Sequence, residues 1–182
     1  MKPGMAVTID GKLCVVVKTD HVKPGKGPAY VQARMREVGG TGFVDKRLNS
    51  SDTVEGTHLD RREAEYLYND GTGYVFMDTE TFDQFTLNED FAGDAMLYLS
   101  PNASTAMLFH DGNPVVIELP GSVELQVTDT PPGIKGATVT NQLKEATLET
   151  GLKTRVPPFI EVGEMIKVST ADGSYMSRVK SE

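Results

Sequence analysis

The residues with the clearest chemical character form one short run, Lys23-Pro24-Gly25-Lys26-Gly27-Pro28. The prolines on either side fix the backbone φ angle, and the two glycines next to Lys26 leave room for a partner to approach the backbone closely. The run therefore predicts a stiff loop that presents one ammonium group at its tip. A chance hairpin loop with an exposed lysine is the alternative that this run alone leaves open.

The strand predicted after this loop, 30–38, carries a second set of basic groups. Because side chains alternate between the two faces of a strand, the apolar and polar residues of this segment separate. One face receives Val31, Ala33 and Met35, and the other receives Tyr30, Gln32, Arg34 and Arg36. Guanidinium groups match phosphate oxygens, so Arg34 and Arg36 predict a basic strip beside Lys26 that fits a nucleic-acid backbone. A solvated charged face explains the same residues equally well.

The charges are unevenly distributed along the chain. The formal net charge is -8 over 182 residues, with 18 basic and 26 acidic side chains. Residues 1–57 hold 9 basic and 6 acidic side chains, residues 58–120 hold 2 and 12, and residues 121–182 hold 7 and 8. The net charge therefore argues against a nucleic-acid-binding protein of the uniformly basic kind. The first third could approach phosphate groups, whereas the middle third would be repelled by them. Solubility is the other explanation for the acidic residues.

The sequence contains no recognisable catalytic or metal-binding motif. No second His or Cys stands at metal-ligand spacing from any of the three histidines, which are His21, His58 and His110. Gly25-Lys26 is not part of a phosphate-binding P-loop, because Asp20 stands where that motif requires glycine and Gly27 where it requires Ser or Thr. We predict that the protein is not an enzyme and that it uses no cofactor or metal.

Two features bear on the cellular compartment. The single cysteine, Cys14, cannot form an internal disulfide and lies in the apolar run Leu13-Cys14-Val15-Val16-Val17, which predicts a buried side chain. No apolar stretch reaches the roughly 18 residues of a membrane helix, and the start Met1-Lys2-Pro3-Gly4 lacks the hydrophobic region of a signal peptide. We expect a cytoplasmic protein without a membrane partner.

Turn signals divide the chain into many short β-prone segments. Asp-Gly pairs favour the positive φ angles of tight hairpin turns, and they occur at Asp10-Gly11, Asp70-Gly71, Asp111-Gly112 and Asp172-Gly173. Further turns are predicted at 39–42 and, after a strand at 123–127, at 131–133. Only 87–99 has helical spacing, over one or two short turns. This pattern predicts an all-β chain of three small β-barrel domains at 1–57, 58–120 and 121–182.

Three groups of motifs carry a resemblance to a known family. The first is the lysine loop, followed by Ala29. The second is Tyr66-Leu67-Tyr68-Asn69-Asp70-Gly71 with Phe76-Met77 and Glu80-Thr81-Phe82. The third and most specific is Lys144-Glu145-Ala146-Thr147-Leu148-Glu149-Thr150-Gly151, then Val156-Pro157, Phe159-Ile160 and Gly163, and finally Gly173-Ser174-Tyr175 and Ser177-Arg178-Val179. Together they resemble bacterial translation elongation factor P along nearly the whole chain.

Two features depart from the family pattern. Thr154 stands where the family signature usually has an aliphatic residue, and relatives usually carry a few more residues before Gly4. Neither departure lies in the lysine loop.

The resemblance implies a fold and a task. The fold is a KOW/SH3-like barrel followed by two OB folds in an L-shaped, tRNA-like arrangement. The implied factor binds the ribosome between the peptidyl-tRNA and exit sites, positions the peptidyl-tRNA and relieves stalls at consecutive prolines. Lys26, flanked by Pro24, Gly25, Gly27 and Pro28, would reach the acceptor end of the peptidyl-tRNA and would be the target of any lysine-modifying enzyme.

The resemblance also implies further contacts. Arg34 and Arg36 would touch the tRNA backbone, and Tyr175 and Arg178 would face the small subunit. An acidic body that imitates tRNA and a basic tip that touches a real one agree with the charge distribution. We expect a monomer.

Two rival interpretations stay open at this stage. One is the elongation-factor-P-like paralogue, which lacks the lysine loop that this chain carries. The other is a general OB-fold RNA-binding module, which would stack bases on aromatic side chains. The candidates for such stacking lie in the acidic middle segment and are Tyr66, Tyr68, Tyr74 and Phe76.

Overall fold

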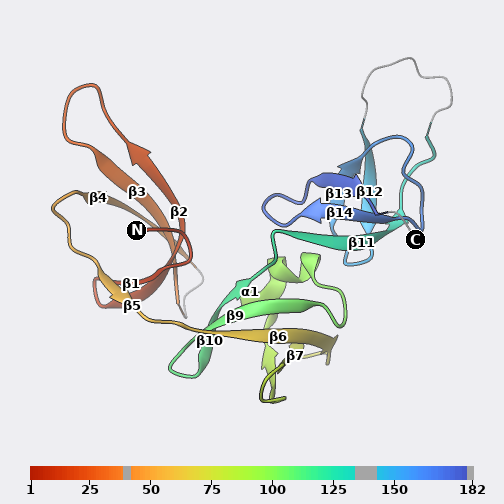
Figure 1. Cartoon of the computed structure of the whole chain (residues 1–182), viewed down its shortest axis with the longest axis horizontal. Coiled ribbons are helices and arrows are strands. Elements are labelled where there is room, and N and C mark those ends of the chain that lie inside the picture. Colours follow the sequence, from red (N-terminus) through yellow and green to blue (C-terminus); the bar gives the residue numbers. More distant parts are fainter. Residues whose placement is uncertain (39–41, 134–142, 180–182) are drawn as a thin grey trace. The chain divides into compact units, whose positions relative to one another are not determined.

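The computed structural model describes residues 1–38, 42–133 and 143–179. Over these residues the chain forms three sheets of five strands each, with helix confined to one short stretch (Figure 1). The predicted all-β class is therefore confirmed. No helix in these three described stretches is long and apolar enough to cross a membrane.

The first sheet carries the lysine loop. Its strands are β1 (Ala6–Ile9), β2 (Lys12–Val22), β3 (Tyr30–Glu37), β4 (Phe43–Asn49) and β5 (Glu55–Thr57), in the order β4-β3-β2-β1-β5. Neighbouring strands run antiparallel. Cys14, Val16, Ala33 and Met35 lie in its core. The predicted burial of Cys14 is confirmed, and the predicted inward face of the strand after the loop is confirmed for Ala33 and Met35, whereas Val31 is half-buried.

The second sheet is formed by the most acidic part of the chain. Its strands are β6 (Asp60–Asn69), β7 (Tyr74–Asp78), β8 (Gln84–Leu87), β9 (Ser104–His110) and β10 (Asn113–Glu118), in the order β10-β9-β6-β7-β8. Between β8 and β9 lie α1 (Glu89–Ala92) and the 3-10 helix η1 (Gly93–Tyr98). The side chain of Asn88 caps α1 by accepting a hydrogen bond from the Phe91 backbone N–H at 2.9 Å. The predicted short helical turns are confirmed, and the tighter 3-10 form begins at Gly93, a poor α-helix former.

The third sheet contains the segment with the most specific family motif. Its strands are β11 (Ser122–Asp129), β12 (Lys144–Leu148), β13 (Lys153–Val156), β14 (Met165–Ser169) and β15 (Tyr175–Arg178), in the order β13-β12-β11-β14-β15. Thr154 is buried in β13, and its hydroxyl donates a hydrogen bond to the Gly173 carbonyl at 2.7 Å. Since the buried hydroxyl has a partner, this departure from an aliphatic residue is accommodated without an unsatisfied polar group.

The four Asp-Gly pairs all lie in hairpin turns, but they act in two different ways. In the β1–β2 and β9–β10 turns both residues have positive φ, with Asp10 at 51° and Asp111 at 50°. This is the predicted geometry. In the other two turns only the glycine has a positive φ. There the aspartate side chain accepts backbone hydrogen bonds instead, Asp70 from Thr72 and Gly73 and Asp172 from Ser174. Side-chain chemistry therefore fixes these two turns.

Two further predicted turns have different outcomes. The turn at 39–42 falls largely on residues 39–41, which lie outside the described residues. The break predicted at 131–133 agrees with the end of β11 at Asp129.

The chain gathers into two compact units. One consists of Met1–Arg61 with Met107–Val116, and the other of Arg62–Ala106 with Ile117–Glu182. Within the second unit, Leu97 and Tyr98 of η1 pack against the core of the third sheet. The Thr150 hydroxyl donates a hydrogen bond to the Leu97 carbonyl at 2.6 Å. The 3-10 helix η1 between β8 and β9 thus packs on the third sheet, and the boundaries 1–57, 58–120 and 121–182 stay a proposal.

Candidate nucleic-acid-binding loop and surface

The lysine loop joins β2 to β3 and projects from the end of this hairpin (Figure 1). Val22 at the end of β2 pairs with Tyr30 at the start of β3, so the loop is closed at its base. Every residue from Lys23 to Ala29 is exposed. The ammonium group of Lys26 is therefore accessible to a partner.

The two glycines beside Lys26 differ in what they contribute. Gly27 has a φ of +117°, a conformation that residues with a side chain rarely adopt, although a Cβ there would lie only in ordinary contact with Pro24, 3.8 Å from its Cγ. Backbone conformation, and not lack of space, requires glycine at this position. Gly25 has open space around its Cβ position and no positive φ. The shape of the loop therefore depends more on Gly27 than on Gly25.

The exposed face of β3 and β4 carries two stacks of an arginine on an aromatic ring. Arg34 Cζ lies 4.7 Å from the centroid of the Phe43 ring, and Arg47 Cζ lies 3.7 Å from the centroid of the Tyr30 ring. Arg34 Nε also lies 4.0 Å from a carboxylate oxygen of Asp45. Rings restrict the guanidinium groups stacked on them. This face therefore presents oriented cations on the sheet that carries Lys26.

The structure places the predicted site residues in two groups. The loop residues and both predicted arginines, Arg34 and Arg36, belong to the first sheet. Tyr175 and Arg178 belong to β15 of the third sheet, where Tyr175 is partly buried against the core and Arg178 forms an ion pair with Glu164. These contacts give both residues a local structural role. Their predicted contact with the small subunit stays a prediction.

Phe43 on this face was not predicted from the sequence as a site residue, and Arg47 was predicted only as one of the basic side chains of the first third that could approach phosphate groups. Phe43 and Arg47 lie on β4, and their side chains are aligned with β3 by the strand register, which pairs Arg36 with Phe43 and Gln32 with Arg47. Alternation along 43–49 places both on one face and is the signal that could have found them. The register of β3 with β4 decides that Phe43 stacks with Arg34 and that Arg47 stacks with Tyr30.

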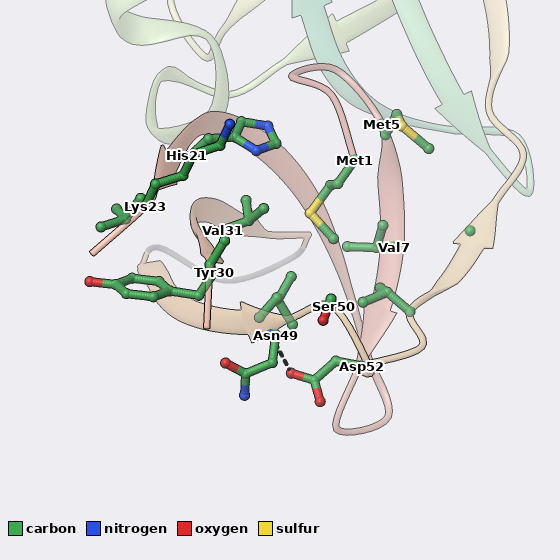
Figure 2. Close-up of a pocket in the computed structure, with 15 residues that line it drawn as sticks. Met1, Met5, Val7, His21, Lys23, Tyr30, Val31, Asn49, Ser50 and Asp52 are labelled. Carbon is green, nitrogen blue, oxygen red and sulfur yellow. Dashed lines mark hydrogen bonds between the residues drawn. The ribbon is translucent and has the colours of Figure 1, made fainter. Parts of the chain in front are cut away.

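A cavity of about 510 Å³ opens at the base of the lysine loop (Figure 2). Both stems of the loop line it, Lys23 on one side and Tyr30 on the other, and Val7 and Val31 contribute apolar surface. At its edge the Asn49 backbone N–H donates a hydrogen bond to the Asp52 carboxylate at 2.7 Å. The volume is typical of small-molecule sites.

The chemistry of metal sites and of reactive thiols has no counterpart in the described stretches. No group of three or more His, Cys, Asp or Glu side chains there could hold a metal ion. Cys14 is 2% exposed, and its burial raises the pKa of the thiol. A buried thiol with a raised pKa is a poor nucleophile at neutral pH.

The aromatic residues of the second sheet are poorly placed for stacking bases. Tyr66 is 7% exposed and Phe76 is fully buried, and their ring centroids lie 5.4 Å apart in the core. Burial also raises the pKa of Tyr66. Only Tyr68 among the four candidates is largely exposed. A row of stacking rings, as expected of a general single-strand-binding module, is therefore absent from these four positions.

Comparison with known proteins defines the class of this protein domain by domain. The elongation factor P KOW-like domain matches residues 1–54, the elongation factor P OB domain matches residues 59–117, and the elongation factor P C-terminal domain matches residues 123–178. A KOW-like barrel with an exposed lysine loop, followed by an OB-type domain and a third β-domain, is the architecture of a translation elongation factor. The chain belongs to the elongation factor P family.

Individual relatives agree with this assignment. The chain is 46% identical over 180 residues to "Elongation factor P" of a Nocardioides species and 48% identical over 180 residues to that of Corynebacterium efficiens. Each alignment covers 99% of this chain and 96% of the relative. A solved structure titled as eukaryotic translation initiation factor 5A, from Methanococcus jannaschii, aligns with a TM-score of 0.45 and 23% identity over 65% of this chain and 87% of its own. That similarity is too low to add to the assignment. The family consists of translation factors and not of enzymes in the ordinary sense.

Proposed function

We propose that this chain binds the ribosome between the peptidyl-tRNA and exit sites, positions the peptidyl-tRNA, and relieves stalls at consecutive prolines. The observation that carries the proposal is the exposed Lys26 at the tip of a closed loop, on the same sheet as the stacked arginines. Membership of the elongation factor P family supports the same task.

In this proposal the ribosome performs the chemistry and the factor supplies geometry. Proline is a poor nucleophile and a poor donor in peptide transfer, so unproductive orientations of the tRNA end are costly. Lys26 would steady the terminal adenosines of the peptidyl-tRNA near the peptidyl-transferase centre. Holding the reactants in a reactive arrangement lowers the entropic part of the barrier. A loop that is already closed and stiff loses little entropy when it makes this contact.

The remaining predicted contacts extend the same proposal. Arg34 and Arg36 would bind the tRNA backbone, and Tyr175 and Arg178 would contact the small subunit. The acidic segment 58–120, with 2 basic and 12 acidic side chains, would belong to a tRNA-like body that avoids direct phosphate contact. We expect the factor to act in the cytoplasm as a monomer.

Modification of Lys26 is a separate part of the proposal. A lysine-modifying enzyme would find this side chain exposed. Pro28 stiffens the loop beyond Gly27, and we infer that the loop needs less help from a modification for that reason. Intact mass of the protein from its native source tests this inference, and an adduct on Lys26 would contradict it.

The function is tested by translation of a message with three consecutive prolines in a reconstituted system that lacks elongation factor P. Wild-type protein is expected to relieve the stall, and Lys26→Ala is expected to leave it. Lys153→Ala removes another exposed lysine, in β13, and is the matched control that should act like wild type. Relief by both wild type and Lys26→Ala would keep the function and remove Lys26 as its agent. Material from the native source replaces recombinant protein if the latter is inactive, and inactivity of both would contradict the function.

A further inference from the structure

The turn between β7 and β8 holds a phenylalanine in a backbone conformation that disfavours it. Phe82 has a φ of +62°, and it is one of four non-glycine residues with positive φ in the described chain. The other three are Asp10, Asn102 and Asp111, residue types that tolerate this region because their short polar side chains bond locally. A bulky aromatic residue there is an outlier. Local preference would place glycine or asparagine at this position.

Hydrogen bonds that Asp78 accepts, and one that its backbone N–H donates, hold the turn in this conformation. The Asp78 side chain is buried, and its carboxylate accepts hydrogen bonds from the backbone N–H groups of Glu80 at 2.8 Å and Thr81 at 3.0 Å. The Phe82 backbone N–H donates to the Asp78 carbonyl at 2.9 Å, and the Asp78 N–H donates to the Asp83 carbonyl at 2.9 Å. These hydrogen bonds hold Phe82 in its strained backbone conformation. Strained residues persist only where the surrounding structure holds them in this way, and they cluster at binding sites.

The Phe82 side chain is not packed in the core, so burial does not offset this strain. It is 69% exposed, the highest value among the exposed large hydrophobic residues of the described chain. The backbone conformation destabilises the folded chain, and the exposed ring contributes almost no burial energy that would offset this strain. Its presence is explained if the ring binds a partner, since buried aromatic anchors carry much of the energy of protein interfaces.

The charges around Phe82 indicate the chemistry of that partner. Glu80 and Asp83 lie in the same turn as Phe82 and are both exposed, and the whole segment 58–120 has 2 basic and 12 acidic side chains. Phosphate groups would be repelled by these carboxylates. An apolar pocket rimmed by Lys and Arg side chains would accept the ring and pair with both carboxylates.

We propose that Phe82 is an anchor residue that inserts into an apolar pocket on a basic protein surface of the ribosome. This inference rests on the proposed function, because it takes the ribosome as the partner. It goes beyond that function by assigning a contact to a turn of the second sheet that does not involve tRNA.

We expect the substitution Phe82→Gly to weaken ribosome binding without destabilising the chain. Phe82→Gly removes the ring and also relieves the backbone strain, so we expect an unfolding temperature equal to or above that of wild type and a dissociation constant for purified ribosomes raised about tenfold or more. Phe82→Asn should weaken binding to the same extent. Asn102→Gly is the matched control, since Asn102 is also exposed with a positive φ of 68°, and it should bind like wild type. Unchanged affinity of Phe82→Gly would overturn the inference.

A photocrosslinker at position 82 identifies the class of partner. The full chain with p-benzoylphenylalanine in place of Phe82 is irradiated with purified ribosomes, and the same group in place of exposed Phe159 serves as comparison. A crosslink from position 82 to a ribosomal protein at a surface rich in Lys and Arg is expected. A crosslink to ribosomal RNA alone, or none, would overturn the inference. Failure of wild type itself to bind ribosomes would contradict the proposed function and the inference with it, whereas normal binding with no effect of Phe82→Gly contradicts the inference alone.

Discussion

Two residues of the lysine loop have different roles, since one provides the charge and the other provides the backbone conformation. Lys26 supplies the only charge at the tip, and Gly27 supplies a φ of +117° that shapes the chain directly after it. The composition of the loop predicted that glycine would be needed, but it treated the two glycines alike. The structure separates them, since only Gly27 lies in a region that other residues avoid.

We predict that Gly27→Ala impairs stall relief nearly as much as Lys26→Ala does. Alanine at this φ is strained by about 1–3 kcal/mol, and an exposed loop escapes the strain by changing shape, which moves the ammonium group. The thermal unfolding midpoint should shift by no more than about 2 °C because the loop is outside the core. The measurement is the translation rate over three prolines together with a thermal melt.

Gly25→Ala is the matched control for this prediction. It places the same methyl group on the other side of Lys26, where nothing lies within 4 Å of it, and it should retain most of the activity. Equal activity of Gly27→Ala and wild type would show that the loop shape seen here is not the one that acts.

At the scale of elements, the β7–β8 hairpin depends on one buried carboxylate. Hydrogen bonds from the Thr81 and Glu80 backbone N–H groups hold the pKa of Asp78 below its ordinary value, and the nearby Arg62 guanidinium, 3.8 Å away, acts in the same direction. The ionised form is therefore favoured in the folded chain. This stabilisation is complete above the pKa that the Asp78 carboxyl has in the unfolded chain, about 3.9. It is lost as the pH falls through the lower pKa of the same carboxyl in the folded chain.

We predict that Asp78→Asn destabilises the chain by about 2 kcal/mol at pH 7, the scale of hydrogen bonds to a charged group. The difference in the free energy of unfolding between wild type and variant should shrink as the pH falls below about 4, because wild type then loses the same charge. Denaturant unfolding at a series of pH values measures it. Asp83→Asn, an exposed carboxylate of the same turn, is the control. A difference that stays constant down to pH 2 would argue that shape, and not charge, accounts for the effect.

Some side-chain positions on these strands and turns could be predicted from the sequence, and others could not. Alternation in 30–38 predicted which side chains of β3 face inward, because a strand with one buried face has a period of two. The stacking of Arg34 on Phe43 was not predicted, since it depends on the register of β3 with β4. Phe82 in a left-handed conformation opposes local preference and is set by the Asp78 hydrogen bonds. The stack depends on contacts between strands that no local pattern contains, whereas the Phe82 conformation depends on hydrogen bonds within 78–83 that the hydrophobic pattern does not report.

At the scale of the whole molecule, charge separates the regions that would meet RNA from those that would not. The first 57 residues carry an excess of basic side chains, and 58–120 carry a large excess of acidic ones. The first region holds the lysine loop and the stacked arginines, while the second holds Phe82 on its acidic turn. We infer that one region contacts nucleic acid and the other contacts protein, so that a single factor would use two kinds of surface.

The role of Lys26 in peptide transfer is tested by the rate of bond formation between peptidyl-prolyl-tRNA and prolyl-tRNA on purified ribosomal complexes. This measurement isolates the peptide-transfer step from initiation and release. Protein from the native source should accelerate it at least tenfold, an effect of about 1.4 kcal/mol on the barrier, and Lys26→Ala should leave the rate close to that without factor. Equal acceleration by both proteins, or none by wild type, would contradict the claim that Lys26 promotes peptide transfer by positioning the tRNA.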